Sequence, residues 1–345
     1  MNIKASVVIL NWNGKSLMEE LLESVVRFST CFDDFKTEVV VADNGSTDGS
    51  VEFLKNKFFG SVKIIDLQYN HGFAEGYNIA ISQLDSEYLV LLNSDVEVTP
   101  DWLKILIDYL DSNKDVVACQ PKIRSLREKD KFEHAGASGG FIDILGYPFC
   151  RGRVLSSLEI DRGQYDEPKD VFWATGACLC IRTQEFRKAG GFDARFFAHM
   201  EEIDLCWRLR SRGKRITCVS ESIVYHLGGA TLNKENPKKT FLNYRNNLLM
   251  LYKNCESKIL LRVFLARFFM DYLSALLFLL SGKFRDASAV FRARRSFWKM
   301  LPDFKAQRIE NLTLTTNKLI PEIYKGSILF EYYLLGKRTF AEIFK

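Results

Sequence analysis

The chain has 345 residues, of which 47% are apolar and 26% are charged. These proportions are ordinary for a globular protein, and they exclude disorder over most of the chain. The length suits one large α/β domain with an extension, or two domains. The net charge is +5, and Lys and Arg are in excess between residues 253 and 308. We therefore expect the C-terminal part to contact a negative partner, either nucleic acid or anionic lipid.

Eight cysteines are present, and none of them has the spacing of a zinc finger. We interpret them as buried, reduced thiols, which are usual in cytosolic proteins. The apolar run at the N-terminus is too short for a signal peptide and continues directly into a strand and a turn. The sequence therefore favours a cytoplasmic protein.

Up to residue 110 the chain alternates between apolar, β-branched runs and segments with helical spacing. Strands are predicted at residues 5–10, 38–43, 62–67 and 88–93, and helices at 17–28, up to 54, at 73–84 and at 100–110. Strands that are apolar throughout and separated by helices imply a parallel sheet covered on both faces. The predicted fold class is α/β, with a single, mostly parallel sheet.

Polar side chains follow the predicted strands at the points where they end. Asn11, Asp43, Asn70 and Asp95 each lie just past the C-terminal end of a strand. Ligands of parallel sheets collect at that edge. We therefore expect these four side chains to converge on one edge of the sheet.

The middle of the chain is less regular. Residues 120–170 are glycine-rich in part and carry scattered charges, and we predict an irregular excursion over the same edge. A strand is expected at 173–182, and a helix from Thr183. The stretch 201–212 has helical periodicity, and a pair of strands is expected to follow it and to end at His226.

The C-terminal part contains a long apolar segment, residues 258–282, which approaches the length of a membrane span. Arg262, Arg267 and Asp271 interrupt it, and each charge at the centre of a lipid-facing helix costs about 2.5 to 3.5 kcal/mol on insertion scales. We predict an amphipathic helix that lies on the anionic inner face of the plasma membrane, beside a basic stretch. The alternative is a helical lid that packs on the rest of the chain or on a second copy, as a homodimer.

The stretch "LLNSDVEVTP", residues 91–100, ends an apolar strand on the carboxylate of Asp95. Such a carboxylate is held rigidly and still faces solvent, so it suits a divalent cation that sits on a diphosphate. The same residue could simply cap a turn. The residue pattern alone leaves both interpretations open.

Seven motifs in register resemble the family 2 glycosyltransferases, in particular the rhamnosyltransferase-like members that build bacterial cell-surface polysaccharides. The resemblance covers about residues 4–254. The motifs are "VVILNWNG" (7–14), "VVVADNGSTDGS" (39–50), "NHGFAEGYN" (70–78), "LLNSDVEV" (91–98), "WATGACLCIR" (173–182), "GGFDARFFAHMEEIDLCWRLRSRG" (190–213) and "VYHLGG" (224–229).

This resemblance implies the A-type glycosyltransferase fold and an inverting transfer from a nucleotide-activated sugar, a dTDP- or UDP-sugar, to a glycan or lipid-linked acceptor. It also implies a catalytic domain over residues 1–254, followed by a helical, basic and apolar extension over 255–345. Nucleic acid is not an expected partner, because binding it would explain the basic tail but none of the acidic side chains at the sheet edge.

The resemblance also implies a site for the nucleotide-sugar donor. Asp43 matches the family carboxylate that accepts hydrogen bonds from the base or ribose, although it could merely cap its turn. Trp12 could line the base pocket or could be ordinary packing. The glycines of "NHGFAEGYN" permit close backbone approach, and the helix after them favours an anion. The residues assigned to the sugar donor are Asn11, Trp12, Asn13, Asp43, Gly72, Asn78 and Asn93.

For the metal, Asp95 matches the final acid of the family's D-x-D element, and Asn93 replaces the first acid. His226 resembles the family histidine that completes the metal shell, with a structural role as the alternative. With one carboxylate fewer, Mg²⁺ or Mn²⁺ would bind mainly together with the diphosphate of the sugar donor.

By the same match, Glu202 is the general base that takes the proton from the acceptor hydroxyl. Relatives often carry Glu-Asp where this chain has two glutamates, so Glu201 and Asp204 stay open as alternatives. Carboxylates here could also simply interact with the helix dipole. Trp173, Gly176 and Glu201 are expected to contact the acceptor, with core packing as the alternative for Trp173.

Two rival functions are considered, and only the first stays open. The first is a catalytically silent homologue that binds sugar nucleotide or organises a polysaccharide assembly complex, because Asn93 and Glu202 depart from the family pattern. The second, a nucleotidyltransferase, is disfavoured, because the first turn "LNWNGKS" lacks the Gly-rich, Arg- or Lys-bearing loop expected there.

Overall fold

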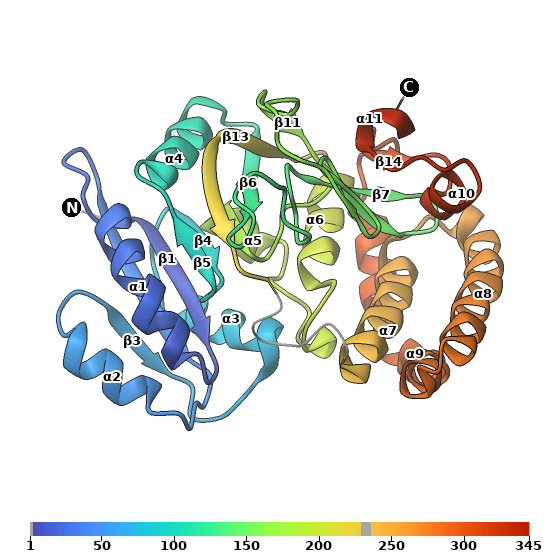
Figure 1. The fold of residues 1–345 in the computed structure, drawn as a ribbon, viewed down its shortest axis with the longest axis horizontal. Coiled ribbons are helices and arrows are strands. Elements are labelled where there is room, and N and C mark those ends of the chain that lie inside the picture. Colours follow the sequence, from blue (N-terminus) through green and yellow to red (C-terminus); the bar gives the residue numbers. More distant parts are fainter. Residues whose placement is uncertain (1–2, 229–235, 345) are drawn as a thin grey trace.

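The computed structural model describes residues 3–228 and 236–344, and its centre is a twisted sheet with helices on both faces (Figure 1). Nine strands form this sheet, eight of them in the order β11-β13-β6-β12-β4-β1-β2-β3, and β5 pairs with β13. The strands are β1 (Ile3–Asn11), β2 (Lys36–Asp43), β3 (Lys63–Asp66), β4 (Tyr88–Leu92), β5 (Val96–Val98), β6 (Val116–Ser125), β11 (Lys169–Asp170), β12 (Cys178–Arg182) and β13 (Arg215–His226).

The helices of the sheet half lie in two layers, because alternate residues of each central strand point to opposite faces. In β1, Val7 belongs to one buried cluster and Val8 to the other. The first cluster is completed by α1 (Lys15–Ser29), α2 (Ser50–Lys57) and α4 (Trp102–Ser112). The second is completed by α3 (Gly72–Ser82), α5 (Thr183–Lys188) and α6 (Glu201–Ser211).

The N-terminal part of the sheet is parallel, as predicted: β1 pairs in parallel with β2 and β4, and β2 with β3. Two details differ from the prediction. β12 runs antiparallel to both of its neighbours, β4 and β6, so the sheet is mixed. The expected pair of strands before His226 is one long strand, β13, whose register against β6 shifts between Val219 and Ile223.

The stretch 120–170 is not irregular, which corrects the expectation. It contains the end of β6 and most of a second, five-stranded sheet, in the order β10-β9-β8-β7-β14. These strands are β7 (Gly140–Asp143), β8 (Pro148–Cys150), β9 (Arg153–Val154), β10 (Ser157–Leu158) and β14 (Ile323–Tyr324). Its edge strand β14 comes from the far C-terminal part of the chain.

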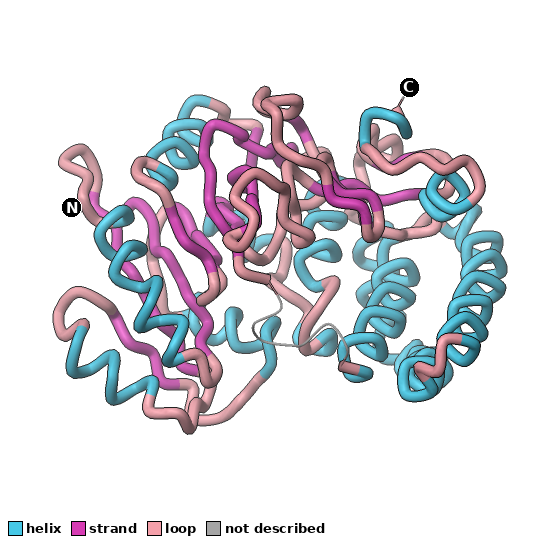
Figure 2. Tube along the Cα trace, in the orientation of Figure 1, coloured by secondary structure: helices cyan, strands magenta, loops and turns pink. Residues whose placement is uncertain are grey.

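The C-terminal part is helical, as predicted, and Figure 2 shows its contrast with the sheet half. Its helices are α7 (Pro237–Asn254), α8 (Ser257–Leu280), α9 (Phe284–Thr313), α10 (Ile328–Tyr333) and α11 (Phe340–Ile343). Contacts cross the predicted boundary at residue 254, because α9 packs along α7 and Arg308 donates hydrogen bonds to the carbonyl oxygens of Tyr252 and Cys255. The boundary itself stays a prediction.

Candidate active site

The ends of β1 and β2 form a polar corner at the carboxyl edge of the sheet. Asn11 and Asp43 are paired in register, and Asn11 Nδ2 donates to Asp43 Oδ2 at 2.8 Å. The backbone N–H of Ser46 donates to the other oxygen, Asp43 Oδ1, also at 2.8 Å. Both side chains are buried. Asp43 is therefore held as an acceptor with a fixed direction.

The turn after β1 is tied to the turn after β2. Asn13 has a left-handed backbone (φ 52°), and its Oδ1 accepts the backbone N–H of Thr47 at 2.8 Å. Trp12, between Asn11 and Asn13, stays 43% exposed. The indole of Trp12 is thus available to a flat ligand, whereas Asn13 already has a structural partner.

The start of α3 differs from the expectation of an open anion site. The carbonyl oxygen of Phe197 accepts the backbone N–H groups of Phe73 and Ala74, at 2.6 and 3.2 Å. Gly72 has φ +80°, and a Cβ there would lie 2.5 Å from the Phe197 ring. The glycine is therefore required by the approach of the loop before α6, and this helix start is already satisfied by a protein carbonyl.

Two further residues assigned to substrates face the protein interior. Asn78 Nδ2 donates to the carbonyl of Phe192 at 2.8 Å, and Asn78 Oδ1 accepts the Phe192 N–H at 3.0 Å. The Trp173 ring lies against Gly140, and its Nε1 donates to the Phe141 carbonyl at 3.0 Å. These contacts correct the expectation, because both side chains are committed to holding the fold.

Asn93 and Gly176 lie near each other at the end of β4. The N–H of Asn93 donates to the carbonyl of Ala177 at 3.0 Å, and Asn93 itself is half-buried. A Cβ on Gly176 would lie 3.2 Å from the Phe73 ring. The antiparallel strand β12 thereby brings the predicted acceptor segment beside the predicted metal segment.

Asp95 and His226 meet because β5 pairs with the end of β13. His226 Nε2 lies 3.0 Å from Asp95 Oδ1, and both side chains are buried. On the other side of the ring, His226 Nδ1 lies 3.1 Å from Glu133 Oε2. Burial lowers the pKa of His226, but its interactions with the carboxylates of Asp95 and Glu133 outweigh burial and raise the pKa to about 10. Gly229, the last residue of the motif around His226, lies outside the described residues.

Asp95 and His226 would hold a cation shared with a substrate only when the metal displaces the proton of the imidazole, which the two neighbouring carboxylates otherwise favour. The 3.0 Å between Asp95 Oδ1 and His226 Nε2 is the length of a hydrogen bond, and it is also the separation of two ligand atoms about 2.1 Å from a metal in adjacent octahedral positions. Within residues 3–228 and 236–344, no group of three or more His, Cys, Asp or Glu side chains surrounds one point. Two protein ligands would leave the remaining positions of such a cation to water and phosphate oxygens. Glu133 was not predicted, and nothing in its local sequence distinguishes it.

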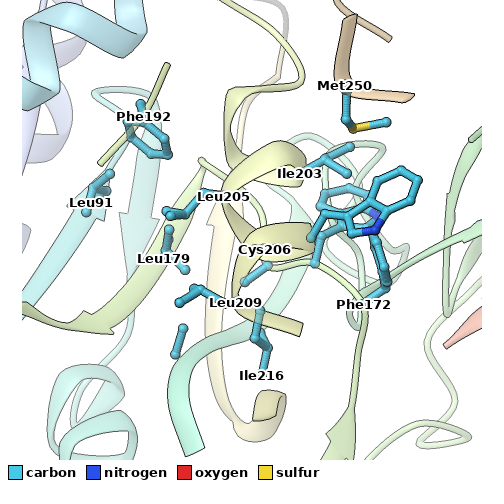
Figure 3. Close-up of a cluster of buried hydrophobic side chains, with 14 of the residues drawn as sticks. Leu91, Phe172, Leu179, Phe192, Ile203, Leu205, Cys206, Leu209, Ile216 and Met250 are labelled. Atoms are coloured by element: carbon cyan, nitrogen blue, oxygen red, sulfur yellow. The ribbon is translucent and has the colours of Figure 1, made fainter. Parts of the chain in front are cut away.

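Helix α6 presents two carboxyls at its N-terminus, and it is buried on nearly all sides. Figure 3 shows Leu205 and Leu209 directed toward Leu179 of the sheet, and Ile203 toward Met250 of α7. Glu201 is buried and Glu202 is partly exposed. Among the residues that the structure describes, Oε2 of each has no hydrogen-bond partner.

The two carboxyls hold their protons more tightly than ordinary glutamates. Burial raises the pKa of Glu202 to about 7, although backbone N–H groups at the helix start lower it in part. Burial, together with the neighbouring Glu202, raises the pKa of Glu201 well above its usual value. A carboxyl that titrates near pH 7 and has an unpaired oxygen can exchange a proton with a substrate hydroxyl.

The loop before α6 has a strained backbone and is held in place by hydrogen bonds from α7. Phe197, His199 and Met200 have φ values of 66°, 71° and 74°, which each cost a non-glycine residue about 1–3 kcal/mol. The buried Asn246 of α7 holds this loop, because its Nδ2 lies 2.8 to 2.9 Å from the carbonyl oxygens of Phe196, Ala198 and His199. Asn246 was also not predicted. An asparagine on the buried face of a helix was the only signal in the sequence.

Asp204, one turn into α6, has a different environment. Its Oδ2 accepts from Arg208 Nε and Lys253 Nζ, at 3.0 and 2.8 Å, and its Oδ1 accepts from Asn254 Nδ2 at 2.8 Å. Both oxygens are therefore engaged in a buried network that joins α6 to the end of α7. The sequence left Asp204 open as the base, and these contacts favour a structural part for it.

Comparison with known sequences finds a family and relatives that this chain resembles. The family model described as "Glycosyl transferase family 2" matches residues 6–167. An N-acetylglucosaminyl-diphospho-decaprenol L-rhamnosyltransferase of Mycobacterium tuberculosis is 28% identical over 203 residues, which cover 54% of this chain and 66% of that protein. The O-antigen biosynthesis protein RfbC of Myxococcus xanthus is 26% identical over 227 residues, which cover 65% of this chain but only 17% of that protein.

Solved structures share the fold. S. aureus TarS 1-349 in complex with UDP-GlcNAc has a TM-score of 0.57 at 18% identity, over 90% of this chain and 89% of that one. A mannosyltransferase of Pyrobaculum calidifontis in complex with GDP-Man and Mn²⁺ has a TM-score of 0.52 at 13% identity, over 91% and 84%. The family match and the shared fold support the predicted family: residues 6–167 match glycosyltransferase family 2, the fold is that of the A-type glycosyltransferases, and the chain is similar in sequence to a rhamnosyltransferase.

Proposed function

We propose that the protein is an inverting glycosyltransferase that moves a sugar from a dTDP- or UDP-sugar to a glycan or lipid-linked acceptor during synthesis of a cell-surface polysaccharide. The two relatives support this class of reaction, since one is named for O-antigen biosynthesis and the other for rhamnosyl transfer to a diphospho-decaprenol lipid. The observation that carries the proposal is the start of α6, where Glu202 combines an unpaired oxygen with a pKa raised by burial to about 7.

The sugar donor would bind at the polar corner of β1 and β2. Asp43 would accept a hydrogen bond from the pyrimidine ring or the ribose, and Asn11 would keep the carboxylate in place. The exposed ring of Trp12 would stack on the base. Asn93, half-buried at the end of β4, would face the diphosphate.

A divalent cation, Mg²⁺ or Mn²⁺, would be held by Asp95 and His226. Bound there, it would supply Lewis-acid stabilisation of the departing diphosphate. The one carboxylate and one imidazole suit Mn²⁺ at least as well as Mg²⁺, and one structural neighbour was solved with Mn²⁺. Glu133, on the far side of the His226 ring, would keep the imidazole oriented.

Glu202 would take the proton from the acceptor hydroxyl as that oxygen attacks the anomeric carbon. Glu201 has its pKa raised well above the usual value, so it would stay protonated and add no second negative charge. The acceptor would lie between this helix start and Gly176. A lipid-linked acceptor would place the protein at the inner face of the plasma membrane.

A screen of purified protein against dTDP- and UDP-sugars tests the proposal. A sugar donor at about a hundred times its Kd should add about 2.7 kcal/mol to the free energy of unfolding, which thermal unfolding detects. The same sugar donor should be hydrolysed or transferred when Mn²⁺ or Mg²⁺ is added, and the Asp95→Ala variant should lose the metal stimulation. Stabilisation without turnover under any condition would instead support the silent homologue.

A further inference from the structure

Helix α8 turns a broad apolar face away from the protein. Every exposed side chain between residues 263 and 280 is apolar. Leu261, Leu265, Phe269 and Leu276 follow helical spacing on this face, and Leu261 is 70% exposed. Figure 1 shows α8 at the edge of the molecule, at the opposite end from α2. So large an exposed apolar face is unusual for a protein that stays in water.

Two of the three charges that interrupt α8 in the sequence, Arg267 and Asp271, point inward, whereas Arg262 near its start is exposed. Arg267 and Asp271 are buried and form an ion pair at 3.2 Å, and Asp271 also pairs with Arg294 of α9 at 2.7 Å. Arg267 further donates to the carbonyl of Leu145, at 3.0 Å, and to Asn247 of α7. The helix is thereby fixed to the protein along its inner face, while its outer face carries no charge beyond its first turns.

Helix α9 extends this surface with aromatic side chains. The rings of Tyr272 on α8 and Phe291 on α9 are in contact, with centroids 5.3 Å apart and planes tilted by 47°. Phe291 and Trp298 are exposed and lie two turns apart on the same side of α9. Aromatic rings with one apolar and one wet side are typical of the boundary between lipid and water.

The exposed charged residues around this apolar face form a rim of positive charge. Its exposed charged residues are all basic: Lys258, Arg262, Lys283, Arg285, Arg292, Arg295 and Lys299. The acids between residues 257 and 300 are Asp271, which is buried, and Asp286, which is half-buried and accepts a hydrogen bond from Thr240 at 2.5 Å. This apolar face with its cationic rim, formed by residues 257–300 of α8 and α9, is called the docking surface below.

We propose that the docking surface binds the headgroup region of an anionic lipid bilayer, with α8 lying in the plane of the membrane. The apolar residues of α8 would enter the acyl boundary, and the basic rim would meet the lipid phosphates. α8 is, among the described residues, the one helix long and apolar enough to cross a membrane. Crossing would separate Asp271 from Arg294, and Arg267 from Leu145 and Asn247, whereas lying flat keeps these bonds.

A second copy of the chain fits this surface less well. In a two-fold dimer the same patch meets itself, so the cationic rims of two copies would face each other without acids to neutralise them. A bilayer containing anionic lipid supplies the missing negative charge. The inference goes beyond sugar transfer and does not depend on it.

Sedimentation with lipid vesicles tests the proposal on the full chain. The protein should pellet with vesicles that contain phosphatidylglycerol, bind at least about tenfold more weakly to pure phosphatidylcholine, and be released by salt. The double variant Leu265→Glu/Phe269→Glu should lose binding at least about tenfold, because it places two carboxylates on the lipid side. The matched control is Phe59→Glu, since Phe59 is 91% exposed at the other end of the molecule.

A second pair of variants separates charge from apolar contact. Arg285→Glu/Arg292→Glu should weaken binding to anionic vesicles, and Lys55→Glu on α2 should not. These residues are exposed, so thermal unfolding should not change. Glu202→Gln should still bind vesicles, which separates a failure here from a failure of the proposed reaction.

Three results would overturn the inference. The first is a wild-type protein that stays in solution with anionic vesicles, or a Phe59→Glu variant that loses as much binding as the α8 variant. The second is a dimer in light scattering that Leu265→Glu/Phe269→Glu dissociates, with no vesicle binding, which would assign the surface to a second copy. The third is protein in cell membranes that alkaline carbonate fails to extract, which would mean that α8 inserts.

Discussion

Two groups of carboxylates lie at the same edge of the sheet, and the protein surrounds them differently. Each oxygen of Asp43 accepts a hydrogen bond, from Asn11 and from the Ser46 backbone. Glu201 and Glu202 each keep an oxygen without a partner among the described residues, and burial raises the pKa of both. A satisfied carboxylate is a fixed acceptor suited to binding, whereas an unsatisfied and desolvated one is suited to moving a proton.

The variant Glu202→Gln tests this difference between the two groups of carboxylates, and it has the largest expected effect. This change keeps the shape of the side chain but removes its ability to accept a proton, so kcat should fall by about 10²–10⁴. The Kd of the sugar donor should stay within a few-fold, because the binding corner is untouched. Steady-state kinetics and a donor titration measure both values. If Glu201→Gln were the inactive variant instead, the base would be the neighbouring glutamate.

Glu133→Gln tests the contact behind the cation site. The change removes the negative charge that faces His226 Nδ1, and the affinity for Mn²⁺ in the presence of UDP should fall about 10–100-fold. Electron paramagnetic resonance counts free Mn²⁺ and needs no turnover. Glu97→Gln is the matched control, since Glu97 lies two residues from Asp95 but pairs with the exposed Lys129. If Glu133→Gln and Glu97→Gln bound Mn²⁺ with equal affinity, Glu133 would have no role in positioning His226.

Asn246→Ala tests the clamp on the strained loop. Without its amide, the carbonyls of Phe196, Ala198 and His199 each lose one hydrogen bond, and Phe196 keeps those from Arg245 and Ala198. The loop before α6 can then relax, so kcat should fall about tenfold while the KM of the sugar donor stays unchanged. Asn243→Ala, on the same helix, is the control. If Asn246→Ala unfolded at a lower temperature but kept the kcat of the wild type, the role of Asn246 would be structural only.

The sheet and its first helices were predictable, because β1, β2 and β4 are apolar on both faces and are followed by amphipathic segments. The direction of β12 could not be predicted, because a short apolar strand has the same residue pattern in either orientation. The small sheet was missed because β8, β9 and β10 have only two or three residues each and no alternating pattern. One of its edges is supplied by β14, about 180 residues later in the chain than β7.

The residues of the candidate site likewise divide into those that sequence motifs predicted and those that they did not. Asp95 and His226 were predicted together from motifs, and they are in contact. Asn78 and Trp173 were assigned to substrates, but their partners are backbone groups of Phe192 and Phe141, which no local pattern reveals. Glu133 and Asn246 were missed for the same reason, because each acts on a segment far away in the sequence.

The pH dependence of kcat/KM, measured on the wild type and on Glu202→Gln, tests the central claim most directly. Only the deprotonated carboxylate can accept the proton, and burial raises the pKa of Glu202 to about 7. The rate of the wild type should therefore fall tenfold per pH unit below about pH 7, and this limb should be absent from the residual activity of the variant. An acid limb near the ordinary glutamate value of about 4.3, or the same limb in both proteins, would contradict the assignment of Glu202 as the base.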